Sequence, residues 1–285
     1  MTDLPADPLR AWWRTAIIDI APGQIGVRGY PIEQLIGSIS FPAMIWLLLR
    51  GDLPSPAQAA LLEAALVASV DHGPQAPSIA IARMSVTCGL PLNNAVASGV
   101  NALGDIHGGA GQQCMELYGA IAAACGEPSP DVATACGERS LEEAVRDEVE
   151  RASRGLGRLI PGFGHRFHPV DPRAVRLLAL VDQAARDGVV AGRFARIGRA
   201  VEAELERRKG RRIPMNIDGV TAVVFCELGF PPPLGRGLFV LSRAAGILAH
   251  AWEQSQQGGR IKGPVPPESG YTYTGAPKRD LPGHT

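Results

Sequence analysis

The 285-residue chain lacks a long apolar run and an excess of either charge. Its longest apolar run, from Phe41 to Leu49, contains Pro42 and falls far short of the ~18 residues that a membrane-spanning helix needs. Its 28 basic and 28 acidic residues balance, whereas a nucleic-acid-binding protein needs a basic surface. We therefore expect neither a membrane nor a nucleic acid among its partners.

Cysteines are few and widely spaced. The chain has five, an odd number, with no C-x-x-C pair and no spacing typical of metal ligands. The first ten residues are acidic and contain proline, unlike a secretory signal peptide. These features predict a reduced, cytoplasmic protein with no metal site.

Helical patterns dominate what is present. Helix starts are indicated by Ser55-Pro56, by the capping box of Ser140 and Glu143, and by Asp171-Pro172, each followed by apolar residues at helical spacing. At most one short strand pairing is expected, near residues 18–30. The sequence predicts an all-α fold in two domains, a large one (1–114 and 226–285) and a small inserted one (115–225), with a ligand-binding cleft between them.

Three of the six histidines lie in glycine-rich turns: His72, His107 and His165. Glycine lets a backbone approach a ligand closely, and a neutral imidazole can donate a hydrogen bond. A single histidine in a loop is more often structural, but three of six in this setting favour a functional role.

Two arginines and one aspartate also stand out. Arg243 lies in an apolar helix, where it needs an internal carboxylate, a route to solvent or an anionic ligand. Arg173 lies in the first turn of a helix, where a cation opposes the helix dipole, although a surface arginine would explain it equally well. Asp218 precedes Gly219 and an apolar helix, so it is either a helix N-cap or a carboxylate base at the mouth of a cleft.

A basic segment, Arg207 to Arg212, holds five cations in six residues just before Asp218. It is either a solvated helix end or a site for phosphate groups such as those of coenzyme A.

Taken in order, these residues resemble the citrate synthase family. The resemblance extends from about residue 25 to 275 and is carried by the following motifs: Arg28-Gly29-Tyr30-Pro31-Ile32-Glu33, Arg50-Gly51-Asp52-Leu53-Pro54, Asp71-His72-Gly73, Gly104-Asp105-Ile106-His107-Gly108-Gly109, Gly162-Phe163-Gly164-His165-Arg166, Asp171-Pro172-Arg173, Asn216-Ile217-Asp218-Gly219 and Ser242-Arg243. Because ordinary citrate synthases are longer, the chain is most similar to citryl-CoA lyase and to the lyase region of ATP-citrate lyase. The resemblance implies a two-domain helical fold and a homodimer.

The resemblance also implies a role for each residue. Asp218 would remove a proton from the acyl-CoA, His107 would stabilise the enolate at the thioester oxygen, and His165 would serve the ketone of the 2-oxoacid. The substrate carboxylates would be held by His72, Arg166, Arg173 and Arg243, and coenzyme A by Arg208, Lys209, Arg211 and Arg212. No metal or cofactor is needed, because coenzyme A enters as the thioester substrate.

The predicted function is therefore formation or cleavage of the carbon–carbon bond between acetyl-CoA and oxaloacetate. One departure concerns the dicarboxylate: Gly263 precedes Pro264, where synthases carry an arginine. The alternatives are a 2-methylcitrate-type synthase and a non-catalytic relative that binds acyl-CoA or a dicarboxylate. The presence of His107, His165 and Asp218 together argues against the non-catalytic relative, because binding alone needs no base.

Overall fold

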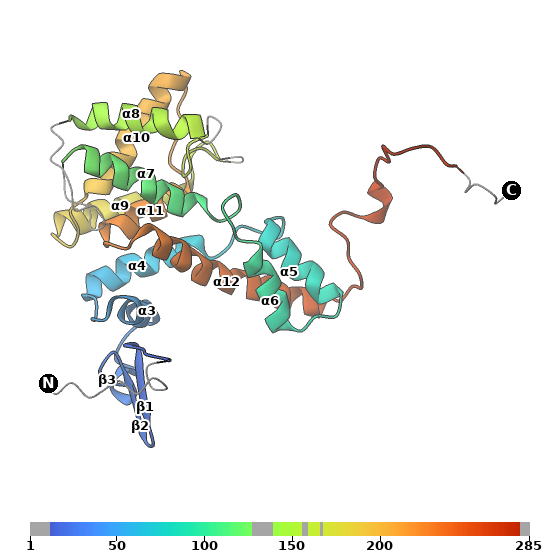
Figure 1. Cartoon of the computed structure of the whole chain (residues 1–285), viewed down its shortest axis with the longest axis horizontal. Coiled ribbons are helices and arrows are strands. Elements are labelled where there is room, and N and C mark those ends of the chain that lie inside the picture. Colours follow the sequence, from blue (N-terminus) through green and yellow to red (C-terminus); the bar gives the residue numbers. More distant parts are fainter. Residues whose placement is uncertain (1–11, 127–138, 156–158, 166–167, 280–285) are drawn as a thin grey trace. The chain divides into compact units, whose positions relative to one another are not determined.

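The computed structural model describes residues 12–126, 139–155, 159–165 and 168–279. The described chain is mostly helical, which confirms the predicted fold class (Figure 1). The helices are α2 (Ile32–Leu35), α3 (Phe41–Arg50), α4 (Pro56–Ser69), α5 (Pro77–Thr87), α6 (Leu92–Asn101), α7 (Ala110–Ala124), α8 (Leu141–Gly155), α9 (Pro172–Arg186), α10 (Arg193–Lys209), α11 (Ile217–Glu227), α12 (Pro232–Gln257) and the 3₁₀ turn η1 (Pro267–Ser269). None of them is long and apolar enough to cross a membrane.

A small antiparallel sheet lies where the sequence predicted a strand pairing. Strand β1 (Ile18–Ala21) pairs with β2 (Gln24–Val27), and β2 pairs with β3 (Tyr30–Pro31). Val27 lies opposite both Ile18 and Tyr30 and is buried, so the sheet contributes one edge of a small apolar cluster with Leu35 and Leu47.

The expected helix starts are present. The Ser55 hydroxyl accepts a hydrogen bond from Gln58 N at 3.2 Å, and the Gln58 side chain accepts one from Ser55 N at 2.9 Å. Ser140 and Glu143 form the same reciprocal pair at 3.3 and 3.2 Å. Short polar side chains therefore fix where these helices begin, as the sequence indicated.

The described chain separates into two compact units, formed by residues 1–70 with 104–243 and by residues 71–103 with 244–285. These units differ from the two domains expected from the sequence, and that domain division stays a prediction. Each unit is described by itself below.

Helix α11 is the centre of the first unit. It is apolar on nearly every side and packs against α4, α7, α9 and α10 (Figure 1). Residues from Ile217 to Phe225 are buried except Asp218. A helix enclosed in this way has little freedom to move, so its first turn is a rigid place for a functional side chain.

In the second unit, α5 and α6 form a pair that packs against the last part of α12. Ile79, Ala82, Ala95, Ile247 and Ala251 make its buried core. The pair is close because α6 has glycine at position 99: a methyl group there would lie 2.7 Å from the Ser78 carbonyl oxygen.

Candidate active site

Asp218 lies in the first turn of α11 and does not cap the helix. The cap is Asn216, whose Oδ1 accepts hydrogen bonds from Asp218 N at 2.9 Å and Gly219 N at 3.2 Å. The interpretation of Asp218 as an N-cap is therefore wrong, because the amide side chain of Asn216, two residues earlier, fills that place. The Asp218 carboxylate is left available for another role.

Two carboxylates from neighbouring helices hold the turn that leads into Asp218. Glu202 of α10 accepts a hydrogen bond from Met215 N at 2.7 Å, and Asp171 accepts one from Ile217 N at 3.0 Å. Backbone groups on either side of Asn216 are thereby fixed. This part of the chain is positioned by long-range contacts rather than by local sequence.

The His165 segment runs alongside the same turn. Gly164 N donates to Pro214 O at 2.8 Å, Asn216 N donates to Gly162 O at 2.9 Å, and the Asn216 amide donates to Gly164 O at 2.7 Å. These bonds bring the backbone that carries His165 next to the start of α11. The sequence interval between them is more than 50 residues, so pairing of the two segments assembles the site.

Glycine makes this pairing possible. Gly162 has φ +84°, and a methyl group there would lie 2.7 Å from both Cys114 Sγ and Gly219 Cα. Any side chain would collide with the α11 backbone or with α7. The glycines around the histidine thus allow close backbone approach, as the sequence predicted.

Arg173 and Asp171 form an ion pair that is also hydrogen-bonded. Asp171 is 1% exposed and caps α9, and its two oxygens accept from Arg173 N at 3.0 Å, Arg173 Nε at 2.9 Å and Arg173 Nη2 at 2.9 Å. Burial alone would raise the pKa of Asp171, but the hydrogen bonds and charge of Arg173 outweigh it and lower the pKa. The unfavourable place of Arg173 at a helix N-terminus is explained by this carboxylate.

The hydrogen bonding of the His165 ring defines its tautomer. Its Nδ1 accepts a hydrogen bond from His168 N at 3.1 Å, so the neutral ring carries its proton on Nε2. Burial lowers the pKa of His165, the charges of His168 and Arg173 lower it further, and Asp171 opposes them. His165 is therefore held as a neutral donor. The ring of His168 lies against it, tilted by 41° with ring centroids 4.6 Å apart.

Arg243 is buried, 4% exposed, on α12. Its Nε donates to Ser69 O at 3.1 Å, and its guanidinium lies 4.9 Å from the centre of the Phe239 ring. Burial lowers the pKa of His107, and the charge of Arg243 lowers it further. A neutral His107 can donate a hydrogen bond without bringing a second positive charge next to Arg243.

The same charged groups influence the pKa of Asp218. Burial raises its pKa, the charges of Arg243 and Arg173 oppose that rise, and Asp171 adds to it. The net shift is upward, which makes the carboxylate a stronger base when ionised and keeps its acid form within reach. Asp218 shares the influence of Arg243 with His107 and that of Arg173 and Asp171 with His165, and in this sense the three residues form one electrostatic cluster.

Two predicted substrate ligands are not brought into this cluster by the described structure. His72 is exposed and belongs to the second unit. Arg166 lies outside the described residues. Their roles stay predictions.

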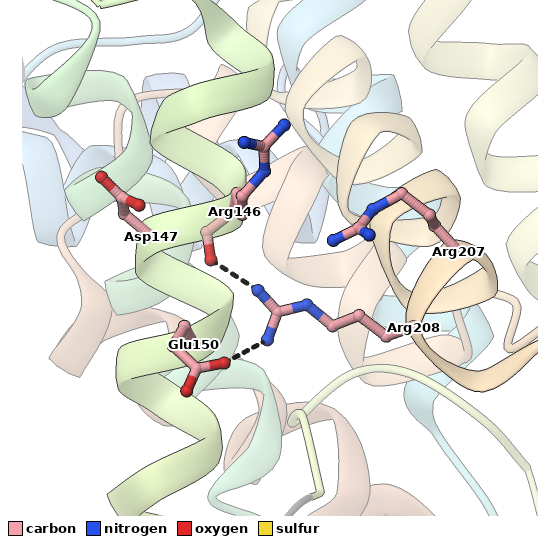
Figure 2. A pocket seen from close by; sticks show the side chains of 5 residues that line it. All are labelled: Arg146, Asp147, Glu150, Arg207 and Arg208. Carbon is pink, nitrogen blue, oxygen red and sulfur yellow. Dashed lines mark hydrogen bonds and ion pairs between the residues drawn. The ribbon is translucent and has the colours of Figure 1, made fainter.

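The basic segment divides into two parts. Arg208 is engaged inside the protein, where it reaches Glu204 at 2.5 Å. It also bonds to Glu150 at 2.8 Å and to the Arg146 carbonyl at 2.7 Å, which joins α10 to α8 (Figure 2). Glu204 also holds Arg207, and the pKa of Glu204 falls to about 2, chiefly through that hydrogen bond. Lys209, Arg211 and Arg212 are exposed. Arg208 has a structural explanation, whereas the other three are open to solvent.

Sequence analysis did not mention Glu202 or His168. It gave Asn216 only as part of a family motif, and Asp171 only as a helix start and part of such a motif. Asn216 and Asp171 had a local signal, since both are residues that cap helices. Glu202 had none, because its partner is a backbone amide 13 residues away. No group of three or more His, Cys, Asp or Glu within the described ranges is arranged to hold a metal.

Comparison with known proteins identifies relatives that match most of the chain. The family model for the citrate synthase C-terminal domain matches residues 54–264. Citrate synthase of Haloferax volcanii is 28% identical over 247 residues, which is 86% of this chain and 58% of that protein. Citrate synthase of Synechocystis is 30% identical over 218 residues, or 73% of this chain and 48% of that protein. The chain thus spans about half the length of these curated relatives.

Among the solved structures, one match extends over nearly the whole of the other chain and another over less than half of it. Citryl-CoA lyase from Hydrogenobacter thermophilus has a TM-score of 0.79 and 33% identity, and the match covers 95% of this chain and 98% of that one. ATP citrate lyase from Methanothrix soehngenii, in complex with citrate and coenzyme A, has a TM-score of 0.73 and 20% identity, over 96% of this chain and 45% of that one. The second similarity shows the shared fold alone.

Proposed function

Because the chain belongs to the citrate synthase family, we propose that it cleaves citryl-CoA reversibly into acetyl-CoA and oxaloacetate. The observation that carries this proposal is the similarity to a citryl-CoA lyase along 98% of that protein's length, at 33% identity. The curated synthases are matched over only about half of theirs. The cluster of Asp218, His107 and His165 supplies the groups that such a reaction needs.

The central step is the interchange of an enolate and a methyl group. In cleavage, the carbon–carbon bond breaks, and its electron pair passes to the methylene carbon and the thioester oxygen. His107 donates a hydrogen bond to that oxygen, and Asp218 in its acid form protonates the carbon to give acetyl-CoA. The raised pKa of Asp218 supports this role, because a carboxyl group of ordinary pKa is almost wholly ionised at neutral pH.

His165 acts on the oxygen atom that becomes the ketone of oxaloacetate. In cleavage it takes the proton of the citryl hydroxyl group, and in condensation it donates to the ketone of oxaloacetate. The described tautomer, with the proton on Nε2, suits the ketone. The described tautomer can only donate a hydrogen bond to that oxygen. Full proton transfer at Nε2, in either direction, links an imidazolium to a ring protonated on Nδ1, and so needs the hydrogen bond from His168 N to break.

Charged groups would hold the substrates. We assign the substrate carboxylates to Arg243, Arg173, Arg166 and His72. Arg173 keeps 24% side-chain exposure despite its pair with Asp171. We assign the phosphates of coenzyme A to the exposed Lys209, Arg211 and Arg212, and Arg208 to a structural role in their support.

The setting of the enzyme is part of the proposal. We expect a homodimer in the cytoplasm that works without a metal or other cofactor. Cys88, Cys114 and Cys226 are free thiols, which fits a reducing compartment.

The test supplies purified protein with citryl-CoA and, separately, with acetyl-CoA plus oxaloacetate. We expect oxaloacetate and acetyl-CoA to appear from citryl-CoA, with a loss of about 10³-fold or more in Asp218→Asn. Asp182→Asn, on the exposed face of α9, is the matched control and should keep full activity. Oxaloacetate-dependent thiol release would make the protein a synthase instead, and inactivity in both assays would refute the proposal.

A further inference from the structure

A chain of polar contacts in the second unit ends at the turn that carries His72. The Asp71 carboxylate accepts a hydrogen bond from Gly73 N at 3.2 Å, which closes a tight turn around His72. Gly73 has φ +83°, and Ala76 N donates to its carbonyl at 3.1 Å just before α5 begins. The Asp71 carboxylate therefore helps to fix the backbone turn that carries His72.

Asp71 is in turn held by His250 of α12. His250 Nε2 lies 3.2 Å from Asp71 Oδ1, and the imidazole is 18% exposed. The same imidazole meets Arg83 of α5, whose Nη1 lies 3.3 Å from Nδ1. Because a guanidinium can only donate, Nδ1 must accept, and the neutral ring then carries its proton on Nε2, the nitrogen that lies beside Asp71.

Arg83 is itself fixed. Its Nη1 donates to Glu253 at 2.5 Å and its Nη2 to Gln257 at 2.8 Å. Glu253 also lies 3.9 Å from His250 Nδ1. The charged groups that face His250 are thus Arg83, Asp71 and Glu253. The whole chain is directional, from Arg83 through His250 to Asp71 and the turn.

We propose that His250, set in its tautomer by Arg83, is a positioning residue that acts through Asp71 to orient His72 toward a substrate carboxylate. This inference rests on the proposed function only for the identity of that carboxylate. A merely structural role is the competing explanation, because the same contacts tie α5 to α12. The two explanations differ in which nitrogen of His250 matters.

Two amide variants separate them. In His250→Gln the amide nitrogen can reach the place of Nε2 and keep a polar contact with Asp71. In His250→Asn the amide oxygen can reach the place of Nδ1 and still accept from Arg83, but the contact with Asp71 is lost. If His250 positions the turn, His250→Gln should be the milder change, because it keeps the contact with Asp71. If His250 only joins the two helices, His250→Asn should be the milder change, because it keeps the contact with Arg83.

The first readout is activity. We expect His250→Asn to raise KM for citryl-CoA about tenfold with kcat changed by less than about twofold, since positioning of a carboxylate ligand affects binding more than chemistry. His250→Gln should recover most of the loss. Gln256→Ala, exposed on the same helix, is the control and should behave as wild type.

The second readout does not depend on turnover. The ring ¹³C–¹H NMR signal of His72, identified by its loss in His72→Gln, should shift in His250→Asn and return toward its wild-type position in His250→Gln. This measurement tests the positioning role even if wild-type protein fails to cleave citryl-CoA, an outcome that would refute only the proposed function. An unmoved His72 signal in His250→Asn, with thermal unfolding as in wild type, would overturn the inference, as would equal effects of Asn and Gln.

Discussion

Replacement of Asp171 by Asn should destabilise the first unit strongly, although the two side chains have nearly the same shape. The two oxygens of Asp171 accept four hydrogen bonds, three from Arg173 and one from Ile217 N. An amide offers one oxygen and one NH₂ group, so donors that now meet the second oxygen would face another donor. Ile217 is buried, and an unsatisfied buried N–H costs about 1–3 kcal/mol.

The lost ion pair adds to this cost. Removal of one partner of a fully buried pair costs about 3–5 kcal/mol, but Arg173 keeps 24% exposure, so solvent recovers part of its charge. We expect a loss of about 2–4 kcal/mol in the free energy of unfolding by urea at pH 7. Asp182→Asn, which breaks the exposed pair with Arg199 at 2.7 Å, should cost less than about 1 kcal/mol.

The effect should also depend on pH in a defined direction. The folded-state pKa of Asp171 is lowered, so its stabilising contribution is present above the unfolded pKa of about 4 and disappears as pH falls through the folded value. The difference between wild type and Asp171→Asn should therefore shrink below pH 4. A difference under 1 kcal/mol at pH 7, or one equal to that of Asp182→Asn, would refute this account of how the Asp218 turn is held.

Three further predictions concern the same region. Asp218→Asn should raise the unfolding temperature while it abolishes turnover, because burial raises the pKa of Asp218 and ionisation above that pKa opposes folding; a lower unfolding temperature at pH 7 would contradict this. Gly162→Ala should lower the free energy of unfolding by about 2 kcal/mol or more, since it adds a methyl group 2.7 Å from Cys114 Sγ at a positive φ, and urea unfolding measures it. Arg211→Gln should weaken coenzyme A binding in calorimetry without a change in stability, whereas Arg208→Gln should lower stability because it leaves Glu150 and Glu204 without a shared partner.

Local rules predicted the elements better than the site. Capping by Ser55 and Ser140 and the opening of α9 at Asp171 depend on residues within a few positions, and the structure contains all three. The start of α11 was placed two residues late for the same local reason. Both Asn216 and Asp218 can cap a helix, and sequence spacing cannot choose between them.

The supporting contacts of the site could not be predicted, because they join segments far apart in sequence. Glu202 holds a backbone amide, which every residue other than proline possesses, so nothing in the sequence marks the pair. The contact between the rings of His168 and His165 likewise has no signal in the sequence. Arg208 illustrates the opposite error: a basic run indicated phosphate binding, but packing of α8 against α10 gave one of its cations internal carboxylate partners.

The central claim is that Asp218 exchanges a proton with the methyl carbon of acetyl-CoA. The most direct test is cleavage of citryl-CoA in D₂O, with the acetyl-CoA product examined by mass spectrometry. A proton of the Asp218 carboxyl group exchanges with solvent, so the account predicts one deuterium in each methyl group, and no product from Asp218→Asn. Acetyl-CoA formed without deuterium, or formed at the wild-type rate by Asp218→Asn, would contradict it.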